Sequence, residues 1–233
     1  MKKLNLKKDV IFTNDTDIRL GFEVECRIRD EDYTKFCREI YNLKKRTNIG
    51  YDGSISGCEF EYRAVEPRTS PLPPKRAMET LRAIFVIVNK YGNTNTSCGL
   101  HVNISSANKF KMKNFDPFPF VYSKLWEQIL RKFKRRNNRY CKTVFGITQK
   151  NAPTKICLFK SMTSVLNDKF KCVNFLHFGN GMNKTSRIEI RGFGNKNYTK
   201  KFEVISIFVK RIEKLFNLSC SSRLHFVKAL NVW

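Results

Sequence analysis

Four short segments of the chain carry pairs of ionisable or polar residues two positions apart. The pairs are Glu23 and Glu25, Glu59 and Glu61, His101 and Asn103, and Glu189 and Arg191. Successive side chains of a β-strand point to opposite faces, so on strands both members of each pair share one face. If the four strands belong to one sheet, five carboxylates, one imidazole and one guanidinium crowd a single surface.

Such a crowd of carboxylates requires cations. Two unit charges about 4 Å apart repel each other by about 4 kcal/mol at an effective dielectric constant of 20. Oxygen ligands with one imidazole favour Mg²⁺ or Mn²⁺ over zinc, and proteins usually hold magnesium with carboxylates and substrate phosphates. The pattern therefore indicates phosphoryl transfer. The alternative is that each Glu lies on the solvent face of its strand, which is the commoner situation for any one pair.

The overall charge of the chain makes the two E-x-E pairs informative. The 233 residues include 45 Lys and Arg against 20 Asp and Glu, a net charge of +25. A chain with so few acidic residues has few to place in such pairs. The positive charge also indicates an acidic partner, and nucleic acid, nucleotide phosphates or a polyanionic acceptor fit it equally well.

The elements that must position these residues follow from hydrophobic periodicity. Apolar and polar residues alternate as in strands over Asp17–Arg29, Gly99–Ser105, Cys172–Phe178 and Arg187–Gly192, with a hairpin around the Asp52–Gly53 turn. Helices are predicted from Asp30 to about Leu43 and over Lys75–Lys90, Val121–Arg136, Ala152–Leu166 (the weakest) and Lys200–Leu218.

These elements predict an α+β fold, in which helices pack on the outer face of a curved, mainly antiparallel sheet and the polar pairs line its concave face. The length, the 41% hydrophobic content and the 20 Phe residues suit one domain over residues 1–233. No segment has the apolar length of a signal peptide or membrane span. Eight cysteines without a C-x-x-C pair argue against a zinc site. We therefore expect a cytoplasmic protein with reduced thiols.

Five motifs, in order along the chain, resemble those of the amidoligase family. They are GFEVE from Gly21, YDGS with EFEYR after it, SCGLHVNIS, NRYC from Asn138, and RIEIRGFG. More distantly, these motifs resemble the E-x-E, G-x-H-x-H-x-S and E-F-R strands of glutamine synthetase and the glutamate-cysteine ligases. The resemblance runs from Gly21 to about Asn197. It implies the glutamine synthetase type of catalytic sheet, with Mg²⁺ and ATP.

The resemblance also implies roles for single residues. Metal ligands would be Glu23, Glu25, Glu61, His101 and Glu189. The third of these remains open, because Glu59, Glu61 and Glu66 all precede Ser70-Pro71. Asn103 stands where many relatives have a second His near the nucleotide. Arg191 would hold the transferring phosphoryl group, with Glu189 beside it, and Arg139 would bind phosphate or substrate.

The expected activity is that of an ATP-dependent carboxylate-amine ligase. In this reaction ATP phosphorylates a small-molecule or peptide carboxylate, and an amine displaces phosphate from the acyl phosphate to leave an amide. Two alternatives remain: a basic nucleic-acid-binding protein, and a catalytically inactive protein that keeps the ligase sheet. The residues name neither the acid, the amine nor the general base.

Overall fold

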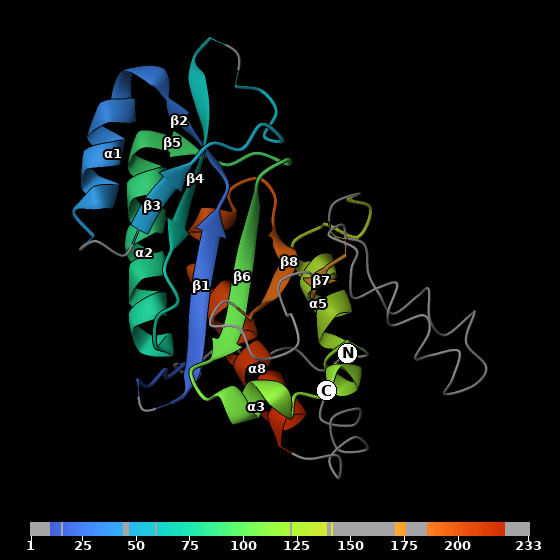
Figure 1. The fold of residues 1–233 in the computed structure, drawn as a ribbon. Helices are drawn as coiled ribbons and strands as arrows, with labels where there is room; N and C mark the ends of the chain where they lie inside the picture. Colours follow the sequence, from blue (N-terminus) through green and yellow to red (C-terminus); the bar gives the residue numbers. More distant parts are fainter. Residues whose placement is uncertain are drawn as a thin grey trace.

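The described part of the chain forms an α+β fold around one antiparallel sheet (Figure 1). The computed structural model describes residues 10–14, 16–43, 47–58, 60–121, 123–138, 141, 171–175 and 186–221. The strands are β1 (Ile18–Val24), β2 (Cys26–Arg29), β3 (Thr47–Gly50), β4 (Tyr62–Thr69), β5 (Gly92–Asn93), β6 (Gly99–Ser106), β7 (Val173–Asn174) and β8 (Ile188–Gly194). Within these residues they make an eight-stranded sheet in the order β5-β2-β4-β1-β6-β8-β7, with β3 beside β4.

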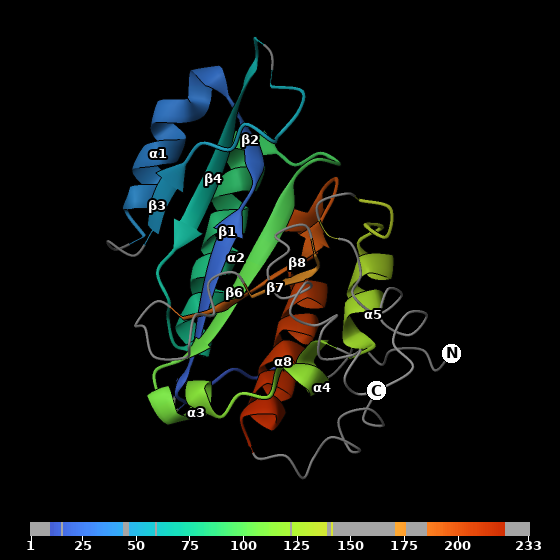
Figure 2. The same ribbon diagram turned by 45° about the vertical axis from the view of Figure 1, so that its right-hand side comes forward.

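Helices pack around this sheet. They are α1 (Tyr33–Tyr41), α2 (Pro74–Tyr91), α3 (Lys109–Lys113), α4 (Pro117–Val121), α5 (Leu125–Lys132) and α8 (Phe202–Cys220). Figures 1 and 2 show α2 and α8 running behind the central strands, with α1 beside α2. Helix α2 begins at Pro74, where the fixed φ of proline suits the first helical position and its missing N–H costs no bond.

Strand alternation decides which face the helices cover. Phe22 and Val24 of β1 and Leu100 and Val102 of β6 are fully buried on the helix side. They belong to one apolar cluster that includes the buried side of α2 and α8. The interleaved residues, which include Glu23 and His101, therefore face away from the helices. The prediction of one domain over 1–233 stays a prediction.

The predicted elements differ from the observed ones mainly at their ends. The long first strand is interrupted at Glu25, and the helix predicted over Val121–Arg136 is shortened to α5. Helices α3 and α4 were not predicted, because each spans only 5 residues, too few to show a period. The helix predicted over Ala152–Leu166 lies outside the described residues.

None of the helices in the described part of the chain combines the length and the apolar character needed to cross a membrane.

Candidate functional site

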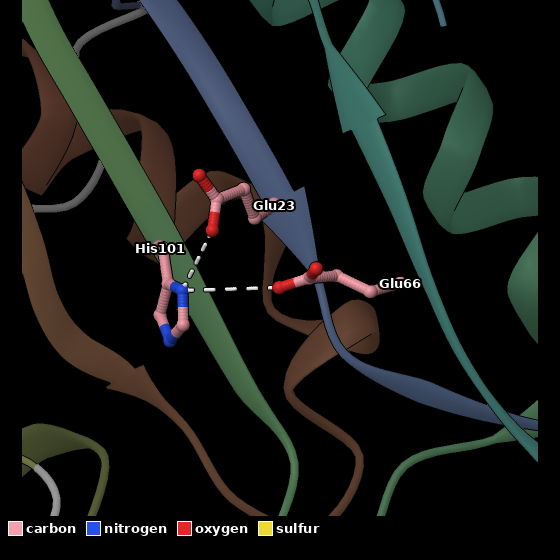
Figure 3. Close-up of side chains that lie close together, drawn as sticks. All are labelled: Glu23, Glu66 and His101. Atoms are coloured by element: carbon pink, nitrogen blue, oxygen red, sulfur yellow. Dashed lines mark hydrogen bonds and ion pairs between the residues drawn. The ribbon is translucent and has the colours of Figure 1, made fainter. Parts of the chain in front are cut away.

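His101 on β6 lies at the centre of the polar face, surrounded by carboxylates from three other strands and the β1–β2 junction. Its Nδ1 lies 3.1 Å from Glu23 Oε2 and 4.0 Å from Glu66 Oε1 (Figure 3). The same nitrogen lies 3.3 Å from Glu189 Oε1, and Nε2 lies 3.1 Å from Glu25 Oε1. Four carboxylates thus converge on one buried imidazole.

Strand register brings Glu23 and His101 together. The two residues are direct partners in the antiparallel β1–β6 pair, so their side chains stand side by side on one face. Glu25 sits where the strand is interrupted. Its backbone N–H donates to Gly99 O at 2.9 Å, and its side chain accepts a hydrogen bond from the Gly99 N–H. The Tyr198 hydroxyl is within hydrogen-bonding distance, 2.9 Å, of both Glu25 O and Gly99 O.

The carboxylate supplied by β4 is Glu66. Strand β4 pairs Arg68 with Glu23 and Val65 with Cys26, a register that sets Glu66 opposite Glu25. Glu66 is 3% exposed. The structure therefore brings in the last of the three alternatives that the sequence left open.

The expectation that Glu61 joins the cluster is not met. Glu61 precedes β4 and is exposed, and its carbonyl oxygen accepts a hydrogen bond from Asp30 N at 2.9 Å. The physical reason is strand parity: Glu61 and Glu66 are separated by an odd number of positions, which puts them on opposite faces. Glu59 lies outside the described residues, as does Arg139.

Glu189 reaches the cluster from β8, where it pairs with Asn103. Its Oε1 accepts a hydrogen bond from Arg191 Nε at 2.6 Å, and its Oε2 accepts one from Asn174 Nδ2 at 3.1 Å. The Asn103 amide donates from Nδ2 to Glu23 Oε1 and accepts from Arg187 Nε, both at 3.0 Å. The predicted pairs on β6 and β8 thus share one hydrogen-bonded network with β1.

Electrostatics within the cluster are dominated by His101. Burial would raise the pKa of Glu23, but the hydrogen bond and the charge of His101 outweigh it and lower that pKa to about 2. The pKa of Glu25 is likewise lowered to about 2, against the effect of burial, by the charge and hydrogen bond of His101. Burial would lower the pKa of His101, but Glu25 and Glu23 raise it to about 10. At neutral pH this structure therefore holds an imidazolium between two carboxylates.

Glu66 behaves differently from its neighbours. Burial and the charge of Glu23 raise its pKa to about 7, although His101 and Arg68 oppose that shift. Arg68 contacts the Glu66 carboxylate through two of its nitrogens. Burial and the charge of Glu23 therefore outweigh the contacts with Arg68 and His101, so Glu66 is partly protonated at neutral pH.

The donor atoms fit a hard divalent cation. Ligand atoms of Glu23, Glu66 and His101 all lie within 4.8 Å of one another, and so do those of Glu25, Asp52 and Glu66. Both sets are dominated by carboxylate oxygen, the chemistry that Mg²⁺ and Mn²⁺ prefer. The sets share Glu66, so a cation in either would interact with the same carboxylate.

Sequence reasoning missed three residues of this region. Asp52 comes from the loop after β3 and had been treated only as a turn residue. Arg68 and Arg187 each lie two positions from a cluster carboxylate, Glu66 and Glu189. The period-2 spacing that picked out Glu189 and Arg191 would have found both arginines, had it been extended outward along the strands.

A hollow of about 380 Å³ opens beside Glu23. Its lining includes the Arg68 and Arg187 side chains, together with Asn103 and the hydroxyl-bearing Thr69. The cluster thus borders a space with two guanidinium groups and several hydrogen-bonding groups. This composition suits an anion.

Cys98, next to the His101 strand, is not an activated thiol. It is fully buried, and burial raises its pKa to about 12. A thiol with this pKa is protonated at neutral pH and is a poor nucleophile.

A scan against models of protein families found no match to this chain, and a search of curated proteins found no similar sequence.

Proposed function

We propose that this protein is an ATP-dependent carboxylate-amine ligase that uses Mg²⁺ or Mn²⁺ and a sheet of the glutamine synthetase type. The observation that carries the proposal is the convergence of four carboxylates on His101 beside a hollow with two guanidinium groups. A cation site next to an anion site is what phosphoryl transfer requires, because metal and arginine together offset the charge on the phosphates.

Two overlapping sets of side chains would hold the metal. Glu23, Glu66 and His101 form one candidate ligand set. Glu25, Asp52 and Glu66 form a second set, which shares Glu66 with the first. When bound, the cation would neutralise phosphate charge and polarise the phosphoryl oxygens. Before that, His101 must give up its proton, because a metal ligand has to be the neutral imidazole.

The arginines and Asn103 act on the phosphates in this proposal. Arg187 and Arg68 line the hollow, where their planar forks can each donate two hydrogen bonds to phosphate oxygens. Asn103, held by Arg187, has an amide that can donate to the nucleotide in place of the histidine of many relatives. Arg191 reaches the cluster beside Glu189 and stabilises the transferring phosphoryl group.

One observation favours the inactive-scaffold alternative. His101 and the guanidinium groups of Arg68 and Arg191 already contact the cluster carboxylates, so the cluster carries its own counter-charges. An ion-pair network of this kind can be purely structural. The nucleic-acid alternative rests on the +25 charge and the aromatic content, whereas the described polar face is rich in carboxylates.

The proposal is tested by incubating the protein with Mg-ATP and pools of small acids, peptides and amines. ADP release is measured, and mass spectrometry identifies an amide product. Glu66→Gln should abolish product formation. Glu61→Gln is the matched control, because Glu61 lies on the same stretch of chain but is exposed and outside the cluster.

The outcomes separate the three functions. Equal turnover by parent and Glu66→Gln would contradict the site. Metal-dependent binding of ATP without any product from the pools would indicate the inactive scaffold. Binding of DNA or RNA that weakens steeply with salt, with no nucleotide binding, would indicate the nucleic-acid alternative.

A further inference from the structure

A second hollow of about 490 Å³ lies at the loop end of the β3–β4 hairpin. Most of its lining residues have aromatic or aliphatic side chains, and the lining also includes the guanidinium-bearing Arg63. The lining includes Tyr33, Ile49, Tyr51, Ile55, Tyr62 and Val65. Pockets of this composition bind apolar groups of ligands.

The hollow exists because the two strands of the hairpin separate. Strand β3 pairs with β4 only as far as Gly50, which lies opposite Glu66. The chain then leaves the sheet and returns at Tyr62. Ile55 from this connection is 5% exposed and forms part of the wall, while Tyr51 is 78% exposed.

Two of the three tyrosines are held in place by arginines. The guanidinium carbon of Arg63 lies 4.5 Å from the ring centroid of Tyr33, and that of Arg27 lies 4.9 Å from the ring centroid of Tyr62. Such cation–π contacts fix the rings before any ligand arrives. The third, Tyr51, is largely exposed, and a ligand in the hollow would cover its ring.

The hollow adjoins the carboxylate end of the metal cluster. Asp52 directly follows Tyr51, and Glu66 lies two positions after Ala64, another lining residue, on the same face of β4. Asp52 and Glu66 belong to the candidate ligand set that includes Glu25. Neither carboxylate lines the hollow itself, but Gly50, which does, pairs with Glu66, so a ligand whose apolar part lies between the tyrosines could reach these carboxylates with its polar end.

We propose that this hollow binds the amine substrate, and that it selects amines carrying an aromatic or branched apolar side chain. The side chain would lie between Tyr51 and Tyr62, with the amino group at the end that Asp52 and Glu66 occupy. The inference rests on the proposed ligase function, in which the guanidinium-lined hollow at the other end of β3 takes the phosphates.

The test uses phenethylamine as the probe, with butylamine and 3-phenylpropionate for comparison, followed by ligand-observed NMR and calorimetry. We expect phenethylamine to bind more tightly than either. Tyr51→Ala should weaken phenethylamine binding by about 10-fold or more, the scale of losing one aromatic contact. Tyr41→Ala is the matched control, because Tyr41 is also an exposed tyrosine, 57% exposed on α1, outside the hollow.

A second variant tests the hollow independently of Tyr51. Cys58 lines the hollow and is partly buried, so Cys58→Phe should fill the space and abolish probe binding. The proposal is overturned if phenethylamine does not bind, if both alanine variants weaken it equally, or if 3-phenylpropionate binds as tightly. Mn²⁺ affinity is measured in parallel. Absence of Mn²⁺ binding would count against the ligase function, whereas the probe data alone decide the hollow.

Discussion

At the scale of single residues, His101 determines the behaviour of the polar face. Carboxylates crowded together repel one another, and on that basis removing one would stabilise the protein without metal. In the structure, however, both nitrogens of His101 are within hydrogen-bonding distance of carboxylates, Glu23 on one side and Glu25 on the other. The imidazolium therefore makes each of these two carboxylates a stabilising group.

Glu23→Gln should keep the fold but lower the free energy of unfolding at pH 7 by on the order of 2 kcal/mol, the scale of a lost charged hydrogen bond. The pKa of Glu23 is lowered from 4.5 to about 2, so the ionised carboxylate stabilises the protein above pH 4.5 and that contribution is lost as the pH falls towards 2. Urea denaturation at pH 7 and pH 3 measures the difference. Glu79→Gln, an exposed position on α2, is the control.

Glu23→Gln and Glu25→Gln should both abolish ATP-dependent ligation. Thermal melts with and without Mg-ATP show whether nucleotide still stabilises each variant. If both variants keep the full shift of the parent protein, Glu23 and Glu25 are not metal ligands.

Affinity for Mn²⁺ should rise with pH. The pKa of His101 is raised to about 10, so at neutral pH a bound metal must displace its proton. One displaced proton strengthens binding about tenfold per pH unit. Below pH 7 the dependence should be steeper, because the pKa of Glu66 is raised to about 7 and its proton must leave as well. Calorimetry at pH 6–8 in buffers of different ionisation enthalpy counts the protons, and binding that releases none would contradict a role for His101 as a ligand.

Arg191→Lys should lower kcat by at least about 10²-fold while changing ATP affinity by less than about 10-fold, as expected when an interaction of the transition state is lost. Lysine keeps the charge but loses the planar fork. Arg187→Lys is the informative comparison, since Arg187 lines the hollow and its loss should weaken ATP binding instead. Near-parental turnover by Arg191→Lys would mean that its bond to Glu189 is structural.

At the scale of elements, the interruption between β1 and β2 is held in position by a distant segment. Tyr198 belongs to the 3-10 turn Tyr198–Lys200, and it is fully buried. Its hydroxyl lies 2.9 Å from the carbonyl oxygens of both Glu25 and Gly99. This turn therefore helps to determine where the Glu25 carboxylate lies.

Tyr198→Phe tests that positioning. Losing the hydroxyl leaves the Glu25 carbonyl without this donor, which should cost about 1 kcal/mol of stability. We also expect weaker Mn²⁺ binding, since Glu25 is then less firmly placed. Tyr41→Phe, at an exposed position of α1, is the control. Lower stability with parental Mn²⁺ affinity would leave Tyr198 a packing residue.

At the scale of the whole molecule, the cluster gathers negative carboxylates in a chain whose net charge is strongly positive. The net charge is +25, yet strands β1, β4 and β8, the β1–β2 junction and the loop after β3 each direct a carboxylate to one region. Because the ligand sets join several strands, a bound cation links parts of the sheet that are far apart in sequence. Metal binding should therefore stabilise the fold as a unit.

Mg²⁺ or Mn²⁺ should raise the Tm of the protein, and EDTA should reverse the rise. A ligand that binds only the folded state at 100 times its Kd adds about 2.7 kcal/mol of stability. Glu66→Gln should lose most of this shift and Glu61→Gln should keep it. A shift equal in both variants would indicate that the cation acts elsewhere on the surface.

The sequence by itself determined which side chains could share a face. Period-2 alternation places Glu23 with Glu25, His101 with Asn103, and Glu189 with Arg191, because the alternation is a local property of each strand. The antiparallel sheet and the covering helices followed from the same local patterns. The glutamine synthetase type of sheet and the ligase chemistry remain proposals.

Only the tertiary structure decided which strands lie side by side and in what register. Choosing Glu66 over Glu61 depended on the pairing of Arg68 with Glu23, a contact between residues distant in sequence. Asp52 joined the cluster because the loop after β3 brings it close to Glu25 and Glu66, which no periodicity describes. Register is fixed by long-range packing, and a shift of one residue would turn every side chain of β4 to the other face.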